Sequence, residues 1–206
     1  MKKRLCLVFF ALVMALGATF PAAADVPETP EVALVKNFYA QLVDTMKQGD
    51  QLGFQGRMKK LDPAVRKAFN LPLMARTAVG FSWSKAQPDE QQKLIDAFSI
   101  FSVANYASQF KRFDGERFDV TGEKPASQGG AIVETTLTPK DGDPVVLNYL
   151  VRPDESGAPR IVDVFLDASI SQLAMRRSEF TAVIKREGLP ALVSSLEDKT
   201  IKMEMN

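Results

Sequence analysis

Apolar residues recur at three- and four-residue spacings over residues 31–48, which predicts an amphipathic helix. Three glycines within the next eight residues are expected to break it. Asp62-Pro63 and Leu71-Pro72 then mark two further helix starts, since a capping residue or a proline suits the first turn. The second start opens a short apolar helix over residues 73–79, which Gly80 closes.

The strongest helix signal covers residues 88–110. Pro88, Asp89 and Glu90 suit a first turn, because proline is tolerated there and acidic side chains favour the helix dipole. Apolar residues then occupy most of the circumference, with small residues such as Ser102 among large aromatic ones. We therefore expect other elements to cover this helix on more than one side.

The pattern changes to strands at about Phe118. Four stretches rich in β-branched residues follow, separated by turns that include a clear hairpin signal at Pro139–Asp143. The predicted strands are residues 118–121, 131–138, 144–152 and 160–166. Helical patterns return over residues 169–187 and 189–196. The predicted fold class is α+β: an antiparallel sheet of about four strands covered by several helices, with an apolar cavity between the layers.

The N-terminus has the pattern of a secretory signal. Lys2, Lys3 and Arg4 precede an apolar stretch over residues 5–20, and Ala22-Ala23-Ala24 offers a cleavage site. We expect a cleaved signal peptide at residues 1–24 and a single domain at residues 25–206; an uncleaved anchor is the alternative. Removing three basic residues lowers the formal net charge from +1 to −2. A near-neutral exported protein is a poor nucleic-acid binder, so no nucleic acid is expected as a partner.

The residue types present exclude several chemistries. The chain has no histidine, and its one cysteine, Cys6, lies within the predicted signal peptide. Ser-His-Asp and Cys-His catalysis, zinc held by Cys or His, and disulfides are therefore excluded. Gly80-Phe81-Ser82-Trp83-Ser84 lacks the final glycine of a nucleophile elbow. We expect no catalytic residue, no metal site and no cofactor.

Charged residues leave some alternatives open. Asp163 or Asp167 could act as general acid or base in a carboxylate-dependent hydrolase, but Asp167 also fits a helix cap and Asp163 a hydrogen-bond partner. Asp141-Gly142-Asp143 fits a hairpin turn better than a calcium site. Arg176-Arg177 and Lys185-Arg186 could meet anionic lipid headgroups or a membrane partner, or could form a solvated helix face.

Residues 162–180, VDVFLDASISQLAMRRSEF, resemble the signature region of the MlaC-like family of periplasmic phospholipid-binding proteins, also called the toluene-tolerance family. PDEQQ at residues 88–92, followed by Phe98 and Phe101, is similar to the start of that family's central helix. IKREGLPAL at residues 184–192 is similar to its penultimate turn. LDASISQLA and RSEF are closer to the HpnM branch, which is associated with hopanoids.

The resemblance implies a deep apolar pocket between sheet and helices, with lipid tails buried and the polar head at its mouth. It implies a soluble periplasmic carrier, here expected to be a monomer, that moves hopanoid-type lipid or phospholipid between the inner and outer membranes. Its partners would be membrane-embedded donor and acceptor proteins. At ~0.8 kcal/mol per methylene, shielding one sixteen-carbon chain from water is worth on the order of 12 kcal/mol.

Twelve apolar or aromatic residues are candidates for the lipid-binding lining, although several are core residues unless a cavity exists. Trp83 is either a core anchor or a lid over an apolar opening. The alternatives to a carrier are the hydrolase above and a periplasmic adaptor that binds no ligand. The candidate lining residues are Leu73, Met74, Phe81, Trp83, Phe98, Phe101, Val133, Leu147, Tyr149, Val164, Leu166 and Ile170.

Overall fold

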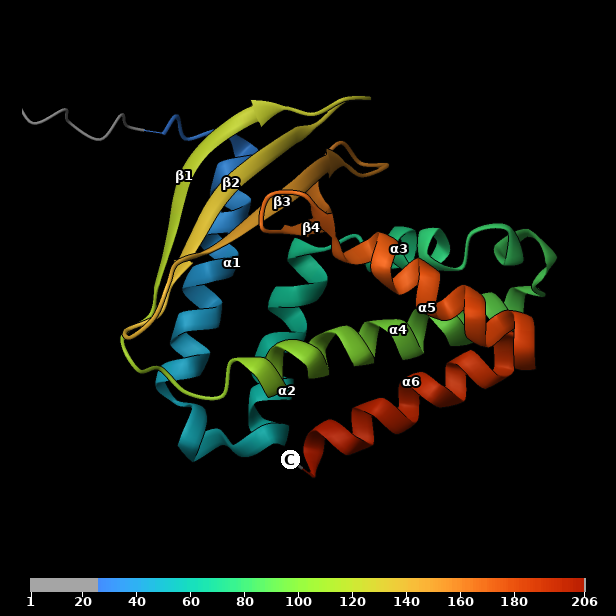
Figure 1. The fold of residues 1–206 in the computed structure, drawn as a ribbon. Helices are drawn as coiled ribbons and strands as arrows, with labels where there is room; N and C mark the ends of the chain where they lie inside the picture. Colours follow the sequence, from blue (N-terminus) through green and yellow to red (C-terminus); the bar gives the residue numbers. More distant parts are fainter. Residues whose placement is uncertain (1–25, 206) are drawn as a thin grey trace, which may run out of the picture.

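The computed structural model describes residues 26–205, so the predicted signal peptide lies outside the described residues. Helices and an antiparallel sheet follow one another as predicted, which confirms the α+β fold class (Figure 1). The elements are α1 (Pro30–Lys47), α2 (Gly49–Ala68), α3 (Leu71–Val79), the 3-10 helix η1 (Gly80–Lys85), α4 (Pro88–Gln109), β1 (Arg117–Pro125), β2 (Ala131–Thr138), β3 (Val145–Pro153), β4 (Pro159–Leu166), β5 (Ile170–Ser171), α5 (Gln172–Glu187) and α6 (Leu189–Glu204).

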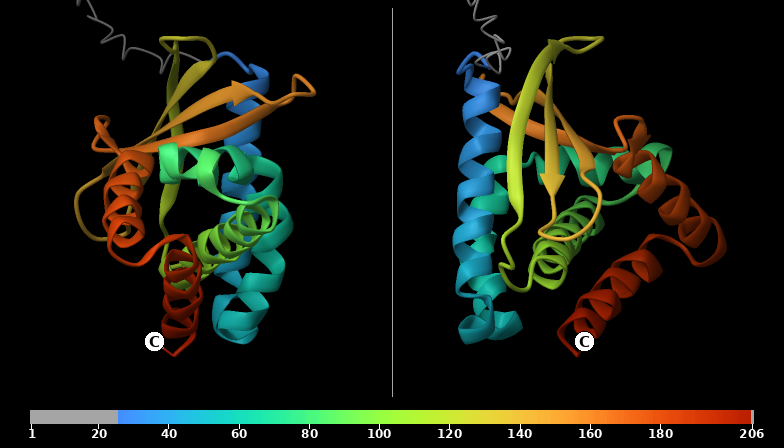
Figure 2. Two further views of the ribbon diagram at one scale, coloured as in Figure 1. Left: turned by 90° about the vertical axis from the view of Figure 1, so that its right-hand side faces the viewer. Right: turned by 60° about the vertical axis from the view of Figure 1, so that its left-hand side comes forward.

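The sheet is an antiparallel meander in the order β1-β2-β3-β4-β5, in which β5 is a two-residue addition to the four long strands predicted. Tyr149 on β3 lies opposite Val133 on β2 and Val164 on β4. Paired residues project from the same face, so these three side chains share one side of the sheet. The helices lie together on one side of the sheet (Figures 1 and 2).

Helix α1 packs closely against the sheet. It begins with Pro30, and the side chain of the capping residue Thr29 accepts a hydrogen bond from the Val32 N–H. Farther along, the Tyr39 hydroxyl lies 2.6 Å from the Thr135 Oγ1 on β2, and its ring centroid is 4.9 Å from that of Phe118 on β1. Apolar packing and a buried hydrogen bond thus fix α1 on the sheet.

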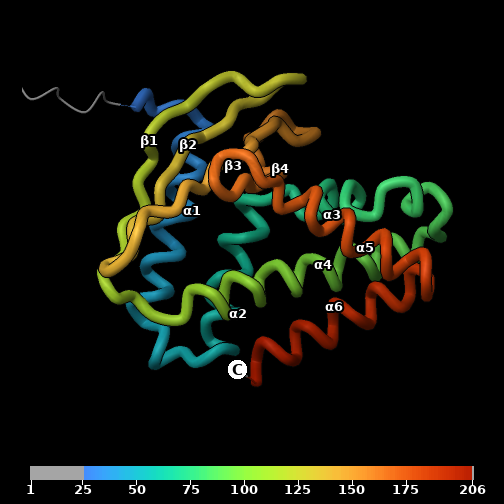
Figure 3. Tube along the Cα trace, in the orientation of Figure 1, coloured from blue at the N-terminus to red at the C-terminus, as the bar shows by residue number. Residues whose placement is uncertain are grey.

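The predicted break after the first helix is confirmed, since α1 ends at Lys47; the sequence pattern did not predict that another helix follows at once. α2 begins at Gly49 and continues to Ala68, with a bend at Gly53 that Figure 3 follows along the chain. Gly53 has φ 61° and ψ −175°, a conformation that favours glycine. Asp62-Pro63 lies inside α2 instead of starting a helix. A proline inside a helix removes one backbone hydrogen bond. Here the neighbouring residues Leu61 and Val65 are fully buried, and this burial offsets the loss.

Helix α4 is the central helix, and the expectation that it is covered on several sides is confirmed: it packs against α2, α3 and α6. Its first turn has a capping box, in which the Gln87 N–H donates to the Glu90 Oε2 at 2.9 Å. Phe101 and Val103 are both buried, although a spacing of two residues places them on nearly opposite faces of the helix. No helix within residues 26–205 is both long and apolar enough to cross a membrane.

The junction between β4 and α5 differs from the prediction. The helix begins at Gln172 instead of Ser169, because Ile170 and Ser171 first pair with β4 as β5. Ser171 is the capping residue: its Oγ accepts from the Ala174 N–H at 2.9 Å. Asp167 is therefore not a helix cap; it lies in the preceding turn with φ 50°. This hairpin places the start of α5 beside the end of β4.

Candidate functional site

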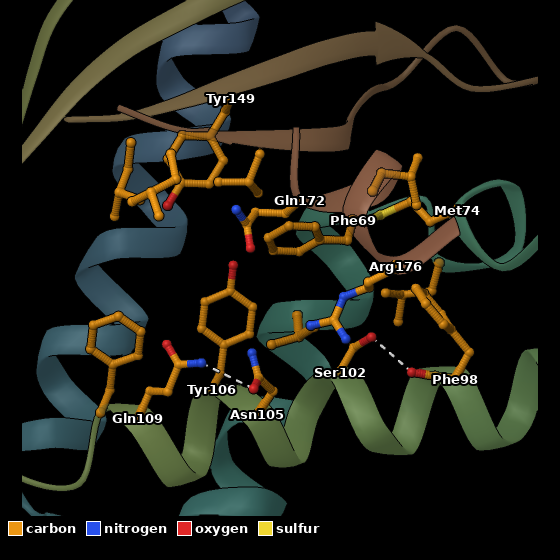
Figure 4. A pocket seen from close by; sticks show the side chains of 17 residues that line it. Phe69, Met74, Phe98, Ser102, Asn105, Tyr106, Gln109, Tyr149, Gln172 and Arg176 are labelled. Atoms are coloured by element: carbon orange, nitrogen blue, oxygen red, sulfur yellow. Dashed lines mark hydrogen bonds between the residues drawn. The ribbon is translucent and has the colours of Figure 1, made fainter. Parts of the chain in front are cut away.

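A cavity of about 210 Å³ lies between α4 and strands β3 and β4 (Figure 4). Residues at the end of α2, on α3 and at the start of α5 complete its wall. Ten lining residues are apolar, two are tyrosines and five are polar or charged. They are Val65, Phe69, Leu71, Met74, Phe98, Phe110, Leu147, Val164, Leu166 and Leu173; Tyr106 and Tyr149; and Ser102, Asn105, Gln109, Gln172 and Arg176.

The periods of helix and strand explain which residues line the cavity. On α4, Phe98, Ser102, Tyr106 and Gln109 follow one another at spacings of three or four and so lie on one helix face. On the sheet, alternate residues point to the same side. The sheet wall is made of two cross-strand pairs, Leu147 with Leu166 and Tyr149 with Val164.

Two tyrosines, Tyr106 and Tyr149, line this largely apolar space, and the Tyr149 hydroxyl is hydrogen-bonded to Tyr39 on α1. Burial raises the pKa of both Tyr106 and Tyr149 above the ordinary value, so both are neutral at physiological pH. Within residues 26–205 the Tyr106 hydroxyl has no hydrogen-bond partner, and the side chain points into the cavity (Figure 4). It is therefore available to a ligand or a water molecule.

Arg176 on α5 is the one charged residue among the described residues that line the cavity. Its guanidinium carbon lies 4.8 Å from the centroid of the Phe101 ring, in a cation–π contact. Burial lowers the pKa of Arg176, but an arginine so placed still carries its charge at neutral pH. The cavity thus combines apolar walls with one positive charge.

The model of the MlaC protein family matches residues 36–198. The chain belongs to the MlaC family. Among solved structures, the fold is similar to that of the phospholipid-binding protein from Ralstonia solanacearum, determined in complex with a phospholipid. That likeness has a TM-score of 0.72 and 23% sequence identity, and it covers 83% of this chain and 97% of the other. A comparison with curated proteins finds no match.

Six of the twelve residues proposed for the lining lie on the wall of the cavity in this MlaC-family protein: Met74, Phe98, Leu147, Tyr149, Val164 and Leu166. They come from α3, α4, β3 and β4, so the fold brings together residues that are up to 92 positions apart in the sequence. Their contact with a lipid stays a prediction.

The structure places the other six elsewhere. Leu73, Phe81 and Ile170 are on the surface, with Phe81 77% exposed beneath the Lys85 ammonium group. Phe101 and Val133 are buried in the packed core, the first under Arg176 and the second on β2, a strand that α1 covers. Trp83 packs against the core without lining the cavity, so it is not a lid over it. Apolar character alone did not distinguish these three environments.

Sequence reasoning missed most of the polar lining. Tyr106 and Gln109 lie two and three turns along α4 from Phe98, so helical spacing from Phe98 would have selected them. Val65 and Phe69 come from the end of α2, and only the tertiary structure brings them beside α4. The sequence leaves Arg176 and Arg177 together, either as contacts for anionic lipid headgroups or a membrane partner or as a solvated helix face; in the structure Arg177 is exposed and Arg176 points into the cavity (Figure 4).

Asp163 has a structural position. Its Oδ1 accepts from the Val164 and Leu173 N–H groups at 2.8 and 3.0 Å, and its Oδ2 accepts from the Ser171 Oγ at 2.5 Å. These bonds hold the first turn of α5, where an acidic group is favourable, against β4. Asp163 and Asp167 both lie outside the cavity lining, and Asp167 is exposed. This geometry favours the interpretation of Asp163 as a hydrogen-bond partner over the hydrolase hypothesis.

Proposed function

We propose that this MlaC-family protein is a periplasmic carrier that buries the tails of a phospholipid between α4 and the sheet and moves the lipid between the inner and outer membranes. The observation that carries the proposal is the cavity itself, with ten apolar side chains on its wall. The family supports the carrier role, and the phospholipid complex of the Ralstonia solanacearum protein supports the ligand class.

The size of the cavity sets a condition on binding. About 210 Å³ is less than the roughly 300–1,000 Å³ of pockets that enclose drug-sized ligands. A lipid with two acyl chains is larger still, so the elements around the cavity must move apart to admit it. Binding is nevertheless favoured, because burial of each methylene of an acyl chain contributes ~0.8 kcal/mol of free energy.

A hopanoid-type lipid is the second candidate ligand. The observation that favours it is the likeness of residues 166–174 and 177–180 to the HpnM branch. Its fused rings would occupy the same apolar walls as acyl chains. The two ligands differ both in the apolar part and in the polar group, so chemical identification of the bound lipid decides between them.

Docking to membrane-embedded donor and acceptor proteins is part of the proposal, with the carrier acting as a monomer. Because Arg176 points into the cavity, the basic surface available on α5 is Arg177 with Lys185 and Arg186, all exposed. Exposed basic side chains of this kind attract anionic membrane surfaces by about 1 kcal/mol each.

Organic extraction of the purified protein, followed by mass spectrometry, tests the carrier function. We expect a phospholipid near one equivalent per chain. Leu166→Glu, which places a charge on the cavity wall, should abolish the bound lipid. Ile100→Glu makes the same change at an exposed apolar position on α4, outside the cavity lining, and should retain it. In a vesicle assay, Ile100→Glu should transfer labelled phospholipid between vesicles, and Leu166→Glu should not.

Repeated absence of any lipid from the wild-type protein, together with no transfer between vesicles, would contradict the carrier function. Equal loss of lipid from Leu166→Glu and Ile100→Glu would show that the effect of a charge on lipid binding is not specific to this cavity. Circular dichroism of each variant shows whether the fold is retained.

A further inference from the structure

The charge of Arg176 is unusual in its surroundings. Its side chain is partly buried, and within residues 26–205 its guanidinium makes no ion pair or hydrogen bond. Glu179 is the acidic residue with the largest influence on its pKa, but the Glu179 carboxylate is paired with Lys199. The Phe101 ring under the guanidinium is not a conventional acceptor, so among the described residues its five N–H donors have no hydrogen-bond acceptor.

Arg57 shows how this protein treats a buried arginine that serves the fold. Arg57 is 7% exposed, and it donates from Nε to the Ala107 carbonyl at 2.9 Å and from Nη1 to the Gly49 carbonyl at 3.0 Å. The first bond joins α2 to the C-terminal part of α4, and the second joins Arg57 to the first residue of α2. Arg176 differs from Arg57: it is partly buried and has no acceptor among the described residues, so its donors are available to water or to an anionic ligand in the cavity.

Other donors face the same space. The Tyr106 hydroxyl has no partner among the described residues, and the Asn105 Oδ1 accepts from the Gln109 Nε2 at 3.0 Å, which leaves the Asn105 amide hydrogens free. Figure 4 shows the side chains of Asn105, Tyr106, Gln172 and Arg176 extending into the cavity. No described lining residue is acidic. An anion with several oxygen atoms matches this set, because arginine binds phosphate through paired N–H donors.

We infer that Arg176 binds the phosphate group of the carried lipid, with Asn105 and Tyr106 as additional donors, and that the cavity thereby selects phosphate-bearing lipids over neutral lipids of the same tails. This inference rests on the carrier function proposed above. It assigns the polar end of the cavity to a phospholipid and disfavours a neutral hopanoid-type alcohol, which has no anion to pair with Arg176.

A competition between two lipids with identical tails tests the selection. Delipidated protein is mixed with dioleoylphosphatidylglycerol and dioleoylglycerol in equal amounts in nonionic micelles, then separated, and the bound lipids are quantified by mass spectrometry. We expect wild-type protein to favour the phospholipid, and Arg176→Gln to lower that preference by about tenfold or more, since hydrogen bonds to charged groups are strong. Arg176→Lys should be intermediate, because it keeps the charge without the planar fork.

Arg76→Gln is the matched control. It removes the same charge from an exposed position on α3, outside both the cavity lining and the basic surface of α5, and should leave the preference within about twofold of wild type. Millimolar inorganic phosphate is added in a parallel sample and should not displace the phospholipid, because free phosphate lacks the tails. Thermal melting shows that each variant is folded; if Arg176→Gln is not, Arg176→Lys and Asn105→Leu give the same comparison.

Four outcomes would overturn the inference. Equal binding of both lipids by wild-type protein, or an unchanged preference in folded Arg176 variants, would leave the carrier function in place and remove the phosphate site. Displacement of the phospholipid by inorganic phosphate would assign Arg176 to a free anion instead. Failure of wild-type protein to bind either lipid would contradict the carrier function and the inference with it.

Discussion

The sheet is covered by helices in two different ways. Where α1 covers the sheet, here called the α1 side, the Tyr39 hydroxyl is hydrogen-bonded to Thr135. The Tyr39 ring packs against those of Phe118 and Tyr149, with centroid distances of 4.9 and 5.7 Å. Where α4 faces the sheet, here called the α4 side, a cavity separates the helix from strands β3 and β4. There the hydroxyl of Tyr106 has no hydrogen-bond partner among the described residues. One tyrosine completes the fold, and the other is left for a ligand.

The difference separates stability from binding. Buried polar groups that are fully bonded stabilise and specify a core, whereas groups left without partners cost stability and mark positions where function has been favoured. The α1 side follows the first rule. Arg176 and Tyr106 on the α4 side follow the second. We therefore expect mutations on the two sides to affect different measurements.

The largest expected contrast is between two leucine truncations. Leu42→Ala on α1 removes a side chain that is 1% exposed and should lower the free energy of unfolding by about 3 kcal/mol. Leu147→Ala on the cavity wall removes a partly buried side chain with fewer packing partners, so its cost should be roughly half or less. Urea denaturation of delipidated protein measures both. Equal losses would show that the cavity wall is packed as tightly as the α1 side.

Two substitutions that enlarge a side chain on α4 test the difference between packed core and cavity. Ala107→Leu overfills a fully buried position and should cost about 1–3 kcal/mol of stability. Ser102→Leu places the same side chain in the cavity, where there is room, and should reduce bound lipid while lowering the melting temperature much less. Lipid content and thermal melting are measured on both variants. Full lipid content in folded Ser102→Leu would place the ligand elsewhere.

The smallest expected effect concerns the Tyr39 hydroxyl. Tyr39→Phe removes its hydrogen bond to Thr135 and should cost about 1 kcal/mol near pH 7. Burial raises the pKa of Tyr39 to about 12. A raised folded-state pKa gives stability that is fully present below the unfolded pKa of about 10 and is lost as the pH rises toward 12.

The wild-type advantage over Tyr39→Phe should therefore shrink above about pH 10, which urea denaturation at neutral and alkaline pH can measure. Lysines titrate in the same range in both proteins, so only the difference between the two is informative. A difference that stays constant to high pH would mean that the Tyr39 hydroxyl is not buried as the structure describes.

Local patterns were sufficient for most of the secondary structure. The broad apolar surface of residues 88–110 predicted a helix covered on several sides, and the alternation over residues 131–166 predicted the antiparallel meander. The errors lie where burial overrode a local signal. Pro63 reads as a helix start, but Leu61 and Val65 are buried along one continuous helix. Asp167 reads as a cap, but two residues of β5 pair with β4 before α5 begins.

The candidate site divides in the same way. Met74, Phe98 and the strand residues could be chosen from apolar character and period, because a helix face and alternate strand positions are local properties. Phe81 and Val133 met the same criteria, yet one is on the surface and the other is in the packed core. Whether an apolar side chain borders a core or a cavity depends on the distance between layers, which no local pattern encodes.

By itself, the sequence determined the order and type of most elements, the exclusion of histidine chemistry, and the resemblance to the MlaC-like family. Only the tertiary structure decided that Arg176 points inward while Arg177 points outward, and that α1 closes on the sheet while α4 leaves a space. Periodicity fixes which face of an element is apolar. The packing of several elements together fixes which of those faces meet and which charge remains without a partner.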